Sequence, residues 1–354
     1  MNAIRTTSAI TLESITKNFS ASSIPALAGV TLDILPATCT AILGPSGSGK
    51  STILRVIAGL ENPSGGRVLV NGTDVTEVLP EHRGIGMVFQ RPLLFPYLNV
   101  IDNIAFAARA AGRNRREARV HALPYLDMVA LGGFGSRSVV SLSGGQEQRV
   151  ALARVLAAQP SILLLDEPFS ALDPALRDEM HDLLRVIRRE LSPTIVLVTH
   201  DRDEASAVAD RIALIENGRL LQHASVDSVY NRPASLAVAR LMGTKNILFG
   251  TVHNGVHESA LGRIRVGDAV FDGDCYLVFR QESVAVSAPS GEVPGENEFD
   301  GHVREIRMHG ARRDLVITAG AGEIHAELPP GMQALLADRV RVTLSPGSLY
   351  VAPA

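Results

Sequence analysis

Hydrophobic and polar positions follow two different patterns along the chain, and the change lies near residue 240. Before it, short apolar runs typical of buried strands are each followed by an amphipathic stretch typical of a helix. Three such pairs are "TCTAILG" with "STILRVIAGL", "SILLLDE" with "LRDEMHDLLRVIRREL", and "PTIVLVTH" with "DRDEASAVADR". Because strand–helix alternation is typical of parallel sheets covered by helices, this part of the chain is predicted to have an α/β fold.

Beyond residue 240 the helical period disappears and short alternating segments follow one another. These segments are "NILFGTVHN", "GRIRVGDAVF", "CYLVFRQESVAV", "GHVREIRMHG" and "DLVITAG". A spacing of roughly 8–12 residues between strands is typical of a small all-β barrel. We therefore predict two domains, residues 1–242 and 243–354, with the boundary within Leu241–Lys245. "SAPSGEVPGENEFDG" is rich in Gly, Pro and Glu, which predicts a loop inside the second domain.

Composition limits the classes to which the protein can belong. The chain has 354 residues, of which 46% are hydrophobic and 20% charged, and its formal net charge is −3. This mild acidity gives no general attraction to nucleic acid. No run of about 18 apolar residues predicts a membrane span, and the N-terminus lacks the apolar core of a secretory signal, so we expect a cytoplasmic protein. Two cysteines, Cys39 and Cys275, are too few for a disulfide framework and are predicted to be buried and reduced.

The stretch "AILGPSGSGKSTILRV" matches the phosphate-binding pattern G-x-x-x-x-G-K-[ST] from Gly44 to Ser51, called here the phosphate loop. Its glycines allow successive backbone N–H groups to face one anion at the N-terminus of a helix. Lys50 can reach the β- and γ-phosphates, and the Ser51 hydroxyl can bind Mg²⁺. The expected ATP-binding residues of this segment are Gly44, Pro45, Ser46, Gly47, Ser48, Gly49, Lys50, Ser51 and Thr52.

Two adjacent carboxylates end the apolar run "SILLLDEP". Ligands of open α/β sheets bind beyond the C-terminal ends of the strands, where Asp166 is predicted to lie and to support Mg²⁺ opposite Ser51. We expect Glu167 to orient or polarise the water that attacks the γ-phosphate. His200 ends a second such run, "SPTIVLVTH", and can contact the γ-phosphate or hold Glu167 and the water in line. The alternatives are a solvated loop position for Glu167 and a structural role for His200.

Six motifs occur in one order over about residues 10–240. They are the phosphate loop, Gln90 in "MVFQ", "LSGGQ" at Leu142–Gln146, "LLLDEP" ending at Pro168, "SALD" at Ser170–Asp173, and "VTH" ending at His200. This set resembles the nucleotide-binding subunit of an ATP-binding cassette (ABC) transporter. The resemblance implies a RecA-like P-loop NTPase core with an antiparallel β subdomain, a helical subdomain at about residues 91–142, and ATP and Mg²⁺ as cofactors.

The resemblance also assigns roles to residues that the pattern alone leaves open. In this family two subunits pair head to tail, so that "LSGGQ" of one closes over the ATP held by the other. Taken alone, "LSGGQ" would be interpreted as a helix cap with glycines. The implied contacts to the partner's ATP come from four residues and are aided by the dipole of the following helix: Ser143, Gly144, Gly145 and Gln146. Asp173 is placed in the dimer-interface loop.

Two further positions carry roles implied by the family. Gln90 stands where a glutamine links Mg²⁺ and the attacking water to the helical subdomain, so Ser51, Gln90 and Asp166 form the expected metal set. With Glu167 and His200, Gln90 completes the expected catalytic set. Phe19 stands where an aromatic residue stacks on adenine, with plain packing as the alternative.

The tail from residue 243 resembles the OB-like (TOBE-type) barrel of bacterial solute-importer ATPases, in "YNRPASLAVARLMGTKNILFGTV" and "VFRQESVAV". The implied function is ATP hydrolysis that powers import of an inorganic ion, oxyanion, polyamine, phosphonate or sugar. The implied partners are a second ATPase subunit, two integral-membrane permease subunits and, indirectly, a periplasmic solute-binding protein. The protein is then expected to be peripheral, at the cytoplasmic face of the inner membrane, with its tail as a dimerisation or regulatory module.

The same resemblance makes "LLFPYLNVIDNI" either the core of the helical subdomain or a groove for a permease helix. Two other classes of protein share the phosphate loop. A P-loop kinase has no use for "LSGGQ" or for the acid pair, and an ABC-type nucleic-acid ATPase would be expected to carry a coiled-coil or zinc insert. The tail has few aromatic residues for base stacking, so we expect no nucleic-acid partner.

Overall fold

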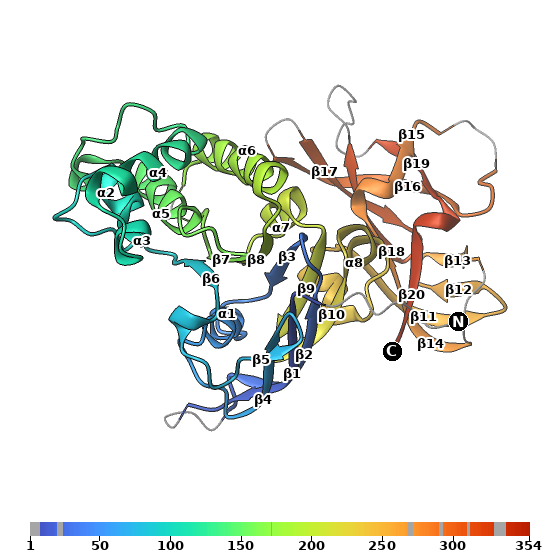
Figure 1. The fold of residues 1–354 in the computed structure, drawn as a ribbon. Coiled ribbons are helices and arrows are strands. Elements are labelled where there is room, and N and C mark those ends of the chain that lie inside the picture. Colours follow the sequence, from blue (N-terminus) through green and yellow to red (C-terminus); the bar gives the residue numbers. More distant parts are fainter. Residues whose placement is uncertain are drawn as a thin grey trace. The chain divides into compact units, whose positions relative to one another are not determined.

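The computed structural model describes residues 8–19, 24–170, 172–267, 272–289, 293–309, 312–328 and 338–354. Parts of four predicted segments therefore lie outside the described residues: Ala171 of "SALD", residues 268–271 of "GRIRVGDAVF", residues 290–292 of the predicted loop and Gly310 of "GHVREIRMHG". The chain divides into two compact units, Met1–Val226 and Asp227–Ala354, whose elements are labelled in Figure 1.

The first unit is built on a six-stranded sheet of order β10-β9-β3-β8-β7-β6. All neighbours pair in parallel except the edge pair of β9 and β10, which is antiparallel. The strands are β3 (Cys39–Leu43), β6 (Ile85–Val88), β7 (Ile162–Asp166), β8 (Thr194–Thr199), β9 (Arg211–Glu216) and β10 (Arg219–Ser225). The three central strands β3, β8 and β7 are buried along their whole length, which requires cover on both faces.

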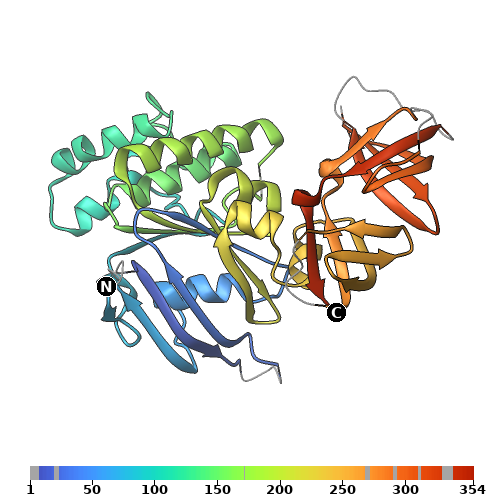
Figure 2. The ribbon, with the colours of Figure 1, turned by 90° about the vertical axis from the view of Figure 1, so that its right-hand side faces the viewer.

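Successive side chains of β7 serve the two faces of this sheet. Ile162 and Leu164 pack in the cluster that contains α1 (Lys50–Ala58), whereas Leu163 and Leu165 pack in the cluster of α5 (Gly144–Leu156) and α6 (Pro174–Leu191). Figures 1 and 2 show α1 on one side of the sheet and α5 and α6 on the other. A run of consecutive apolar residues is therefore what this position demands, because each residue is buried against one layer or the other.

Two smaller subdomains flank this core. An antiparallel sheet of order β2-β1-β4-β5 shares its apolar face with α1. A helical subdomain lies between β6 and α5, and Asn99 and Asn114 cap its helices α2 and α4. The elements of these subdomains are β1 (Ile10–Lys17), β2 (Leu27–Ile34), β4 (Gly65–Val70), β5 (Thr73–Asp74), η1 (Pro80–His82), α2 (Val100–Ile104), α3 (Phe106–Ala110), α4 (Arg115–Met128) and η2 (Val139–Ser141). The helix α7 (Arg202–Val208) packs instead on the core, against β3, β8 and α6.

The second unit contains two five-stranded antiparallel sheets, of order β13-β12-β11-β14-β20 and β15-β19-β16-β17-β18, whose apolar faces share one core. Two short helices, α8 (Val226–Asn231) and α9 (Leu236–Leu241), precede them. The strands are β11 (Asn246–His253), β12 (Val256–Ser259), β13 (Gly262–Arg265), β14 (Gly273–Phe279), β15 (Val284–Ser287), β16 (Glu298–His309), β17 (Arg312–Ala319), β18 (Gly322–Leu328), β19 (Arg339–Leu344) and β20 (Leu349–Pro353), with the 3-10 turns η3 (Gln281–Ser283) and η4 (Pro346–Ser348). The predicted fold class, an α/β P-loop core followed by a small all-β domain, is confirmed.

The division between the two units falls earlier in the chain than residue 242, where the sequence pattern placed it. The reason is the buried Arg280, at the end of β14. Its guanidinium donates to the carbonyl oxygens of Tyr230 and Met242 and lies 3.7 Å from the Tyr230 ring centroid. A side chain of the β domain thus holds α8 and α9, although their helical period resembles that of the preceding part of the chain.

The position of this division can be tested by truncation. A chain of residues 1–226 keeps every strand of the first unit and is expected to unfold in one cooperative calorimetric transition. A chain of residues 1–245 adds α8 and α9 without Arg280, so those helices should exchange their amide protons freely and leave the melting temperature unchanged. A cooperative transition for residues 1–245 but none for residues 1–226 would show that the two helices belong to the first unit.

Candidate functional site

The phosphate loop connects β3 to α1, and its backbone is too crowded for side chains at two of its glycines. A Cβ on Gly44 would lie 2.0 Å from the carbonyl oxygen of Ile215. Gly49, the N-cap of α1, has φ 102°, and its Cβ would lie 2.5 Å from the carbonyl oxygen of Ala26. Glycine is therefore required at both positions, by close approach at Gly44 and by backbone conformation at Gly49 as well.

The polar groups of this loop suit a phosphate. The Lys50 ammonium donates to the carbonyl oxygens of Gly44 and Pro45 at 2.9 and 2.8 Å, which bends its side chain over the loop. Burial lowers the pKa of Lys50. The Ser48 hydroxyl is buried and makes no hydrogen bond to any described residue. A buried ammonium beside an unpaired buried hydroxyl, at the N-terminus of a helix, fits an anionic ligand.

Two of the three residues expected at the metal, Ser51 and Asp166, are already adjacent, and the third, Gln90, contacts Glu167. Ser51, in the first turn of α1, donates from its hydroxyl to Asp166 Oδ1 at 2.9 Å. Asp166 ends β7 and is buried, and this burial raises the pKa of its carboxyl group, against the lowering effect of the Ser51 hydrogen bond. A hydroxyl and a carboxylate at this separation fit Mg²⁺, which commonly takes one or two protein oxygens and completes its shell with phosphate and water.

Glu167 has an unusual backbone conformation. Its φ is 45°, in the left-handed region, which costs about 1–2 kcal/mol for a non-glycine residue. The Glu167 N–H donates to the Val198 carbonyl oxygen at 3.0 Å, which holds this turn against β8. Strained backbone of this kind is frequent at functional sites, where the surrounding structure holds it in place.

The Glu167 carboxylate meets side chains from the two neighbouring strand ends. Gln90 Nε2 donates to Glu167 Oε2 at 3.2 Å, and His200 Nδ1 lies 3.4 Å from Glu167 Oε1. Gln90 follows β6, Glu167 follows β7 and His200 follows β8, which are consecutive in the sheet. Parallel pairing thus brings the three residues of the expected catalytic set together, next to the metal pair.

One residue of this region was missed by the sequence analysis. Glu204, in the first turn of α7, is buried and accepts a hydrogen bond from the Thr199 hydroxyl, and burial raises the pKa of its carboxyl group. Thr199 is the residue before His200, so this contact supports the turn from which His200 projects. The only sequence signal is the acidic residue four positions after His200, which by itself also fits a helix N-terminus.

Ser143 occupies the N-cap of α5 in a reciprocal capping box with Gln146. Gln146 donates its backbone N–H to the Ser143 hydroxyl at 3.4 Å, and Ser143 donates its own to Gln146 Oε1 at 3.1 Å. Ser143 and Gly144 are exposed, whereas Gly145 is buried, and its Cβ would lie 3.1 Å from Leu176 Cδ1. Within one chain this turn is a helix cap, whose exposed hydroxyl and N-terminal N–H groups are available to an external anion.

Two other expected residues lie at the surface. Asp173 is exposed and caps α6, accepting a hydrogen bond from the Leu176 N–H at 3.0 Å. Phe19 is 39% exposed, with the Lys17 ammonium 5.0 Å from its ring centroid. Its role toward adenine stays a prediction.

Among the described residues, no group of three or more His, Cys, Asp and Glu side chains could hold a metal ion without other ligands. A metal at Ser51 and Asp166 would therefore depend on the nucleotide for further oxygens. Searched over the same ranges, no helix has both the length and the apolar character needed to cross a bilayer. Cys39 and Cys275 are free and buried, as predicted.

The chain is similar to known proteins over most of its length. The pattern of the family described as "ABC transporter" matches residues 27–170. The sulfate/thiosulfate import ATP-binding protein CysA 1 of Rhizobium meliloti is 40% identical over 95% of this chain and 97% of its own. The Fe(3+) ions import ATP-binding protein FbpC 1 of the same organism is 36% identical over 95% of each chain. The spermidine/putrescine import ATP-binding protein PotA of Oleidesulfovibrio alaskensis is 39% identical over 88% of this chain and 85% of its own.

Solved structures match about three fifths of the chain. The structure of cbiO1 from Clostridium perfringens, part of the cbiONQ ABC transporter complex, has a TM-score of 0.59 and 32% identity and covers 63% of this chain and 90% of that one. A dimeric structure of the ATP-binding cassette MJ0796 bound to ADP and Pi, in a post-hydrolysis state, has a TM-score of 0.56 and 34% identity and covers 61% of this chain and 98% of that one.

The two adjacent carboxylates can be separated by substitution. Asp166→Asn removes the charge next to Ser51 and should weaken Mg²⁺-dependent ATP binding as well as turnover. Glu167→Gln keeps the metal pair and should leave ATP affinity unchanged while lowering turnover by about 10²–10⁴-fold, the usual range for a general base. Single-turnover hydrolysis and equilibrium ATP binding measure the two effects. A Glu167→Gln variant that hydrolyses ATP at the wild-type rate would contradict this assignment.

Proposed function

The chain belongs to the ABC transporter family, and we propose on this basis that it is the subunit whose ATP hydrolysis powers import of a small solute through a membrane permease. As a member of this family it binds and hydrolyses ATP. The observation that carries the proposed mechanism is the convergence of Gln90, Glu167 and His200 beyond the phosphate loop. The relatives named above are import ATP-binding proteins, which argues against a kinase or a nucleic-acid ATPase.

Each residue of the site has a distinct task in hydrolysis. Lys50, Ser48 and the N–H groups of the phosphate loop bind the β- and γ-phosphates and keep the terminal phosphate in line for attack. Ser51, Asp166 and Gln90 would hold Mg²⁺, which neutralises charge on the phosphate oxygens when bound. Glu167 orients the attacking water and accepts its proton.

The positions of Gln90 and His200 explain why both are needed. Both contact the Glu167 carboxylate, so they restrict its orientation toward the water. Gln90 also lies at the start of the connection to the helical subdomain, two residues after the end of β6. A displacement of that subdomain would therefore move a side chain that touches the catalytic carboxylate.

We infer that the working unit is a homodimer. The exposed turn of Ser143 and Gly144 can close an ATP site only from another molecule, and two-fold symmetry then completes two sites with two identical chains. The dimeric state named for MJ0796 supports this arrangement. ATP bound between the chains would draw them together, and its hydrolysis would release them.

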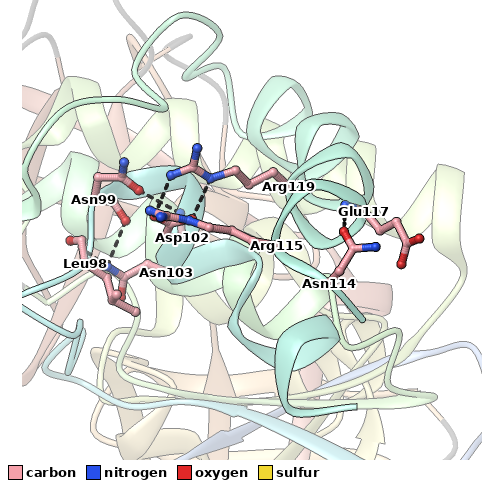
Figure 3. Close-up of polar contacts among 8 residues, drawn as sticks. All are labelled: Leu98, Asn99, Asp102, Asn103, Asn114, Arg115, Glu117 and Arg119. Carbon is pink, nitrogen blue, oxygen red and sulfur yellow. Dashed lines mark hydrogen bonds and ion pairs between the residues drawn. The ribbon is translucent and has the colours of Figure 1, made fainter. Parts of the chain in front are cut away.

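The helical subdomain offers a surface for the permease, on the part shown in Figure 3. A hollow of about 530 Å³ is lined by Ile101, Arg115, Arg116, Arg119, Val120, Leu123, Gly135 and Ser136. Val120 and Leu123 are 61% and 48% exposed, unusual for aliphatic residues on one helix face. An apolar floor with an arginine rim fits an amphipathic permease segment that carries acidic residues.

Asp102 makes this surface rigid. It accepts hydrogen bonds from Arg119 at 2.7 Å and from Arg115 at 2.8 Å, which join α2 to α4 (Figure 3). The hydrogen bond from Arg119, followed by that from Arg115, lowers the pKa of Asp102 to about 2, so it stays ionised at physiological pH. Asp102 thereby fixes the guanidinium groups of Arg115 and Arg119 at the rim of the hollow, and its negative charge offsets part of their positive charge.

The segment "LLFPYLNVIDNI" contributes both to the subdomain core and to its surface. Asn103 is fully buried and donates from its amide to the carbonyl oxygens of Phe95, Leu98 and Asn99. Tyr97, in contrast, is 77% exposed. The segment therefore supplies residues to the subdomain core, and we propose that its exposed residues, such as Tyr97, belong to the groove for a permease helix.

The second unit is proposed as a dimerisation or regulatory module. The relatives that align over nearly the whole chain include this part, and their named solutes are sulfate or thiosulfate, ferric ion and polyamines. We propose a small ion or polyamine as the solute class, selected mainly by a periplasmic binding protein and by the permease, with the ATPase at the cytoplasmic face of the membrane. Transport of labelled solutes by vesicles containing the chain and its permease tests this; transport unaffected by Glu167→Gln would refute it.

Nucleotide-driven dimerisation gives a direct test of the shared sites. The Glu167→Gln chain with ATP and Mg²⁺ is expected to sediment as a dimer, because hydrolysis no longer releases it. Adding Ser143→Arg should return it to a monomer by crowding the opposing γ-phosphate. Ser136→Arg, an equally large change at another exposed serine, should leave the dimer intact. A monomer under all nucleotide conditions would contradict the shared-site arrangement.

The docking surface can be tested separately from catalysis. Leu123→Glu places a charge on the apolar floor and should lower solute transport on the order of tenfold or more, as expected for a central interface residue. ATP hydrolysis by the isolated chain should not change. Leu191→Glu, at the end of α6 and similarly exposed at 43%, is the matched control and should transport normally. An equal loss of solute transport in both variants would contradict the proposal that this surface binds the permease.

A further inference from the structure

Leu93 has a backbone conformation that its own side chain does not explain. Its φ is 45°, in the left-handed region that bulky residues seldom adopt. The side chain is 61% exposed, so burial of the leucine does not compensate for this conformation. Leu93 lies shortly after Gln90, on the segment that leads from the catalytic carboxylate into the helical subdomain. Some other group must hold the backbone here.

Arg154 is that group. It lies near the C-terminal end of α5, and its guanidinium donates from Nη1 to the Leu93 carbonyl oxygen at 3.0 Å and from Nη2 to the Pro92 carbonyl oxygen at 3.3 Å. The guanidinium carbon also lies 5.2 Å from the centroid of the Phe95 ring. Arg154 thus contacts three of the residues that follow Gln90.

This interaction is not an ion pair. Among the residues that the structure describes, no carboxylate lies within salt-bridge distance of Arg154, and burial lowers the pKa of its guanidinium. Arg154 is half-buried, so its guanidinium has lost part of its contact with water, and hydrogen bonds from a charged donor are the strong ones. The two carbonyl oxygens are therefore held firmly, and the conformation of Leu93 with them.

The location of Arg154 gives this contact a functional meaning. Ser143 caps the N-terminus of α5, and Arg154 follows on the same helix about 16 Å away at 1.5 Å per residue. Between them, Val150, Ala151 and Leu152 are buried against the first unit's core. The turn proposed to close the partner's ATP site therefore lies at one end of α5. Near the other end of the same helix is Arg154, which binds the segment that follows Gln90.

We propose that Arg154 is a positioning residue, whose hydrogen bonds to Pro92 and Leu93 keep Gln90 against Glu167 and join the helix that begins at Ser143 to the catalytic set of the same chain. This proposal rests on the roles of Gln90 and Glu167 proposed above. It also predicts the movement that would follow from dimer closure. A force on the turn at Ser143 would be passed along α5 to the segment of Gln90, and from there to the water-orienting carboxylate.

The test uses ATP hydrolysis by the full-length chain. Arg154→Met removes both hydrogen bonds and should lower kcat about tenfold, the effect of losing a strong charged hydrogen bond, without changing equilibrium ATP binding. Arg154→Lys keeps the charge and one donor and should retain part of the rate. If Arg154→Met does not fold, as judged by its thermal transition, Arg154→Lys carries every comparison below.

The substitution Leu93→Gly distinguishes a positioning role of Arg154 from a general contribution of Arg154 to the stability of the fold. Leu93→Gly adopts a positive φ without steric cost, so in the Arg154→Met background it should restore most of kcat. The matched control is Ala130→Gly, because Ala130 is also exposed and left-handed, with φ 57°, but is not held by Arg154. Equal restoration by both glycines would mean that only general stability was lost, and no restoration by Leu93→Gly would also overturn the proposal.

A double-mutant cycle with Gln90→Ala tests whether Arg154 affects catalysis through Gln90. If Arg154 acts through Gln90, Arg154→Met should lower kcat little further in that background; full additivity overturns the proposal. The proposal is also overturned if Arg154→Met has the wild-type kcat, or if its lower activity comes entirely from weaker ATP binding. If Gln90→Ala alone turns over normally, the assumed role of Gln90 fails instead, so the two failures are distinguishable.

Discussion

The site depends on the parallel pairing of β3, β8, β7 and β6, which sets four strand ends side by side at one edge of the sheet. The residues that follow these strands are the phosphate loop, His200, Glu167 and Gln90. A parallel ladder offers the same end of every strand at the same edge, so groups distant in sequence become neighbours without any loop having to fold over the site. Both faces of the sheet are packed, and this rigidity is what allows contacts near 3 Å between short loops.

Electrostatics and strain act together at this edge. Lys50 and Asp166 are both removed from water, and burial lowers the pKa of the first and raises the pKa of the second. Burial disfavours the charged form of both residues. The negative phosphates of ATP would stabilise the charged form of Lys50, and Mg²⁺ would stabilise that of Asp166. The left-handed conformation of Glu167 is also unfavourable, and it directs this carboxylate away from Asp166, as the two proposed roles require.

Helices connect the nucleotide site to the surface of the first unit. α5 begins at an exposed capping box and ends near Arg154, which holds the segment that follows Gln90. Asp102 and Asn103 keep that part of the helical subdomain as one body, the first by binding two arginines and the second by satisfying three carbonyl groups. The proposed docking surface and the proposed catalytic set are thus connected by a series of hydrogen bonds, several of them partly buried.

The sequence by itself determined the fold class, the phosphate loop and the acid pair, because period, glycine spacing and strand-end position are local properties. It also marked the family through the order of six motifs. Only the tertiary structure decided that Glu167 faces Gln90 and His200, that α8 and α9 join the β domain, and that Arg154 holds Leu93. These depend on contacts between residues far apart in the chain and on a left-handed backbone that no residue type announces. They also depend on arginines whose partners are carbonyl groups, which every residue carries and no sequence pattern can reveal.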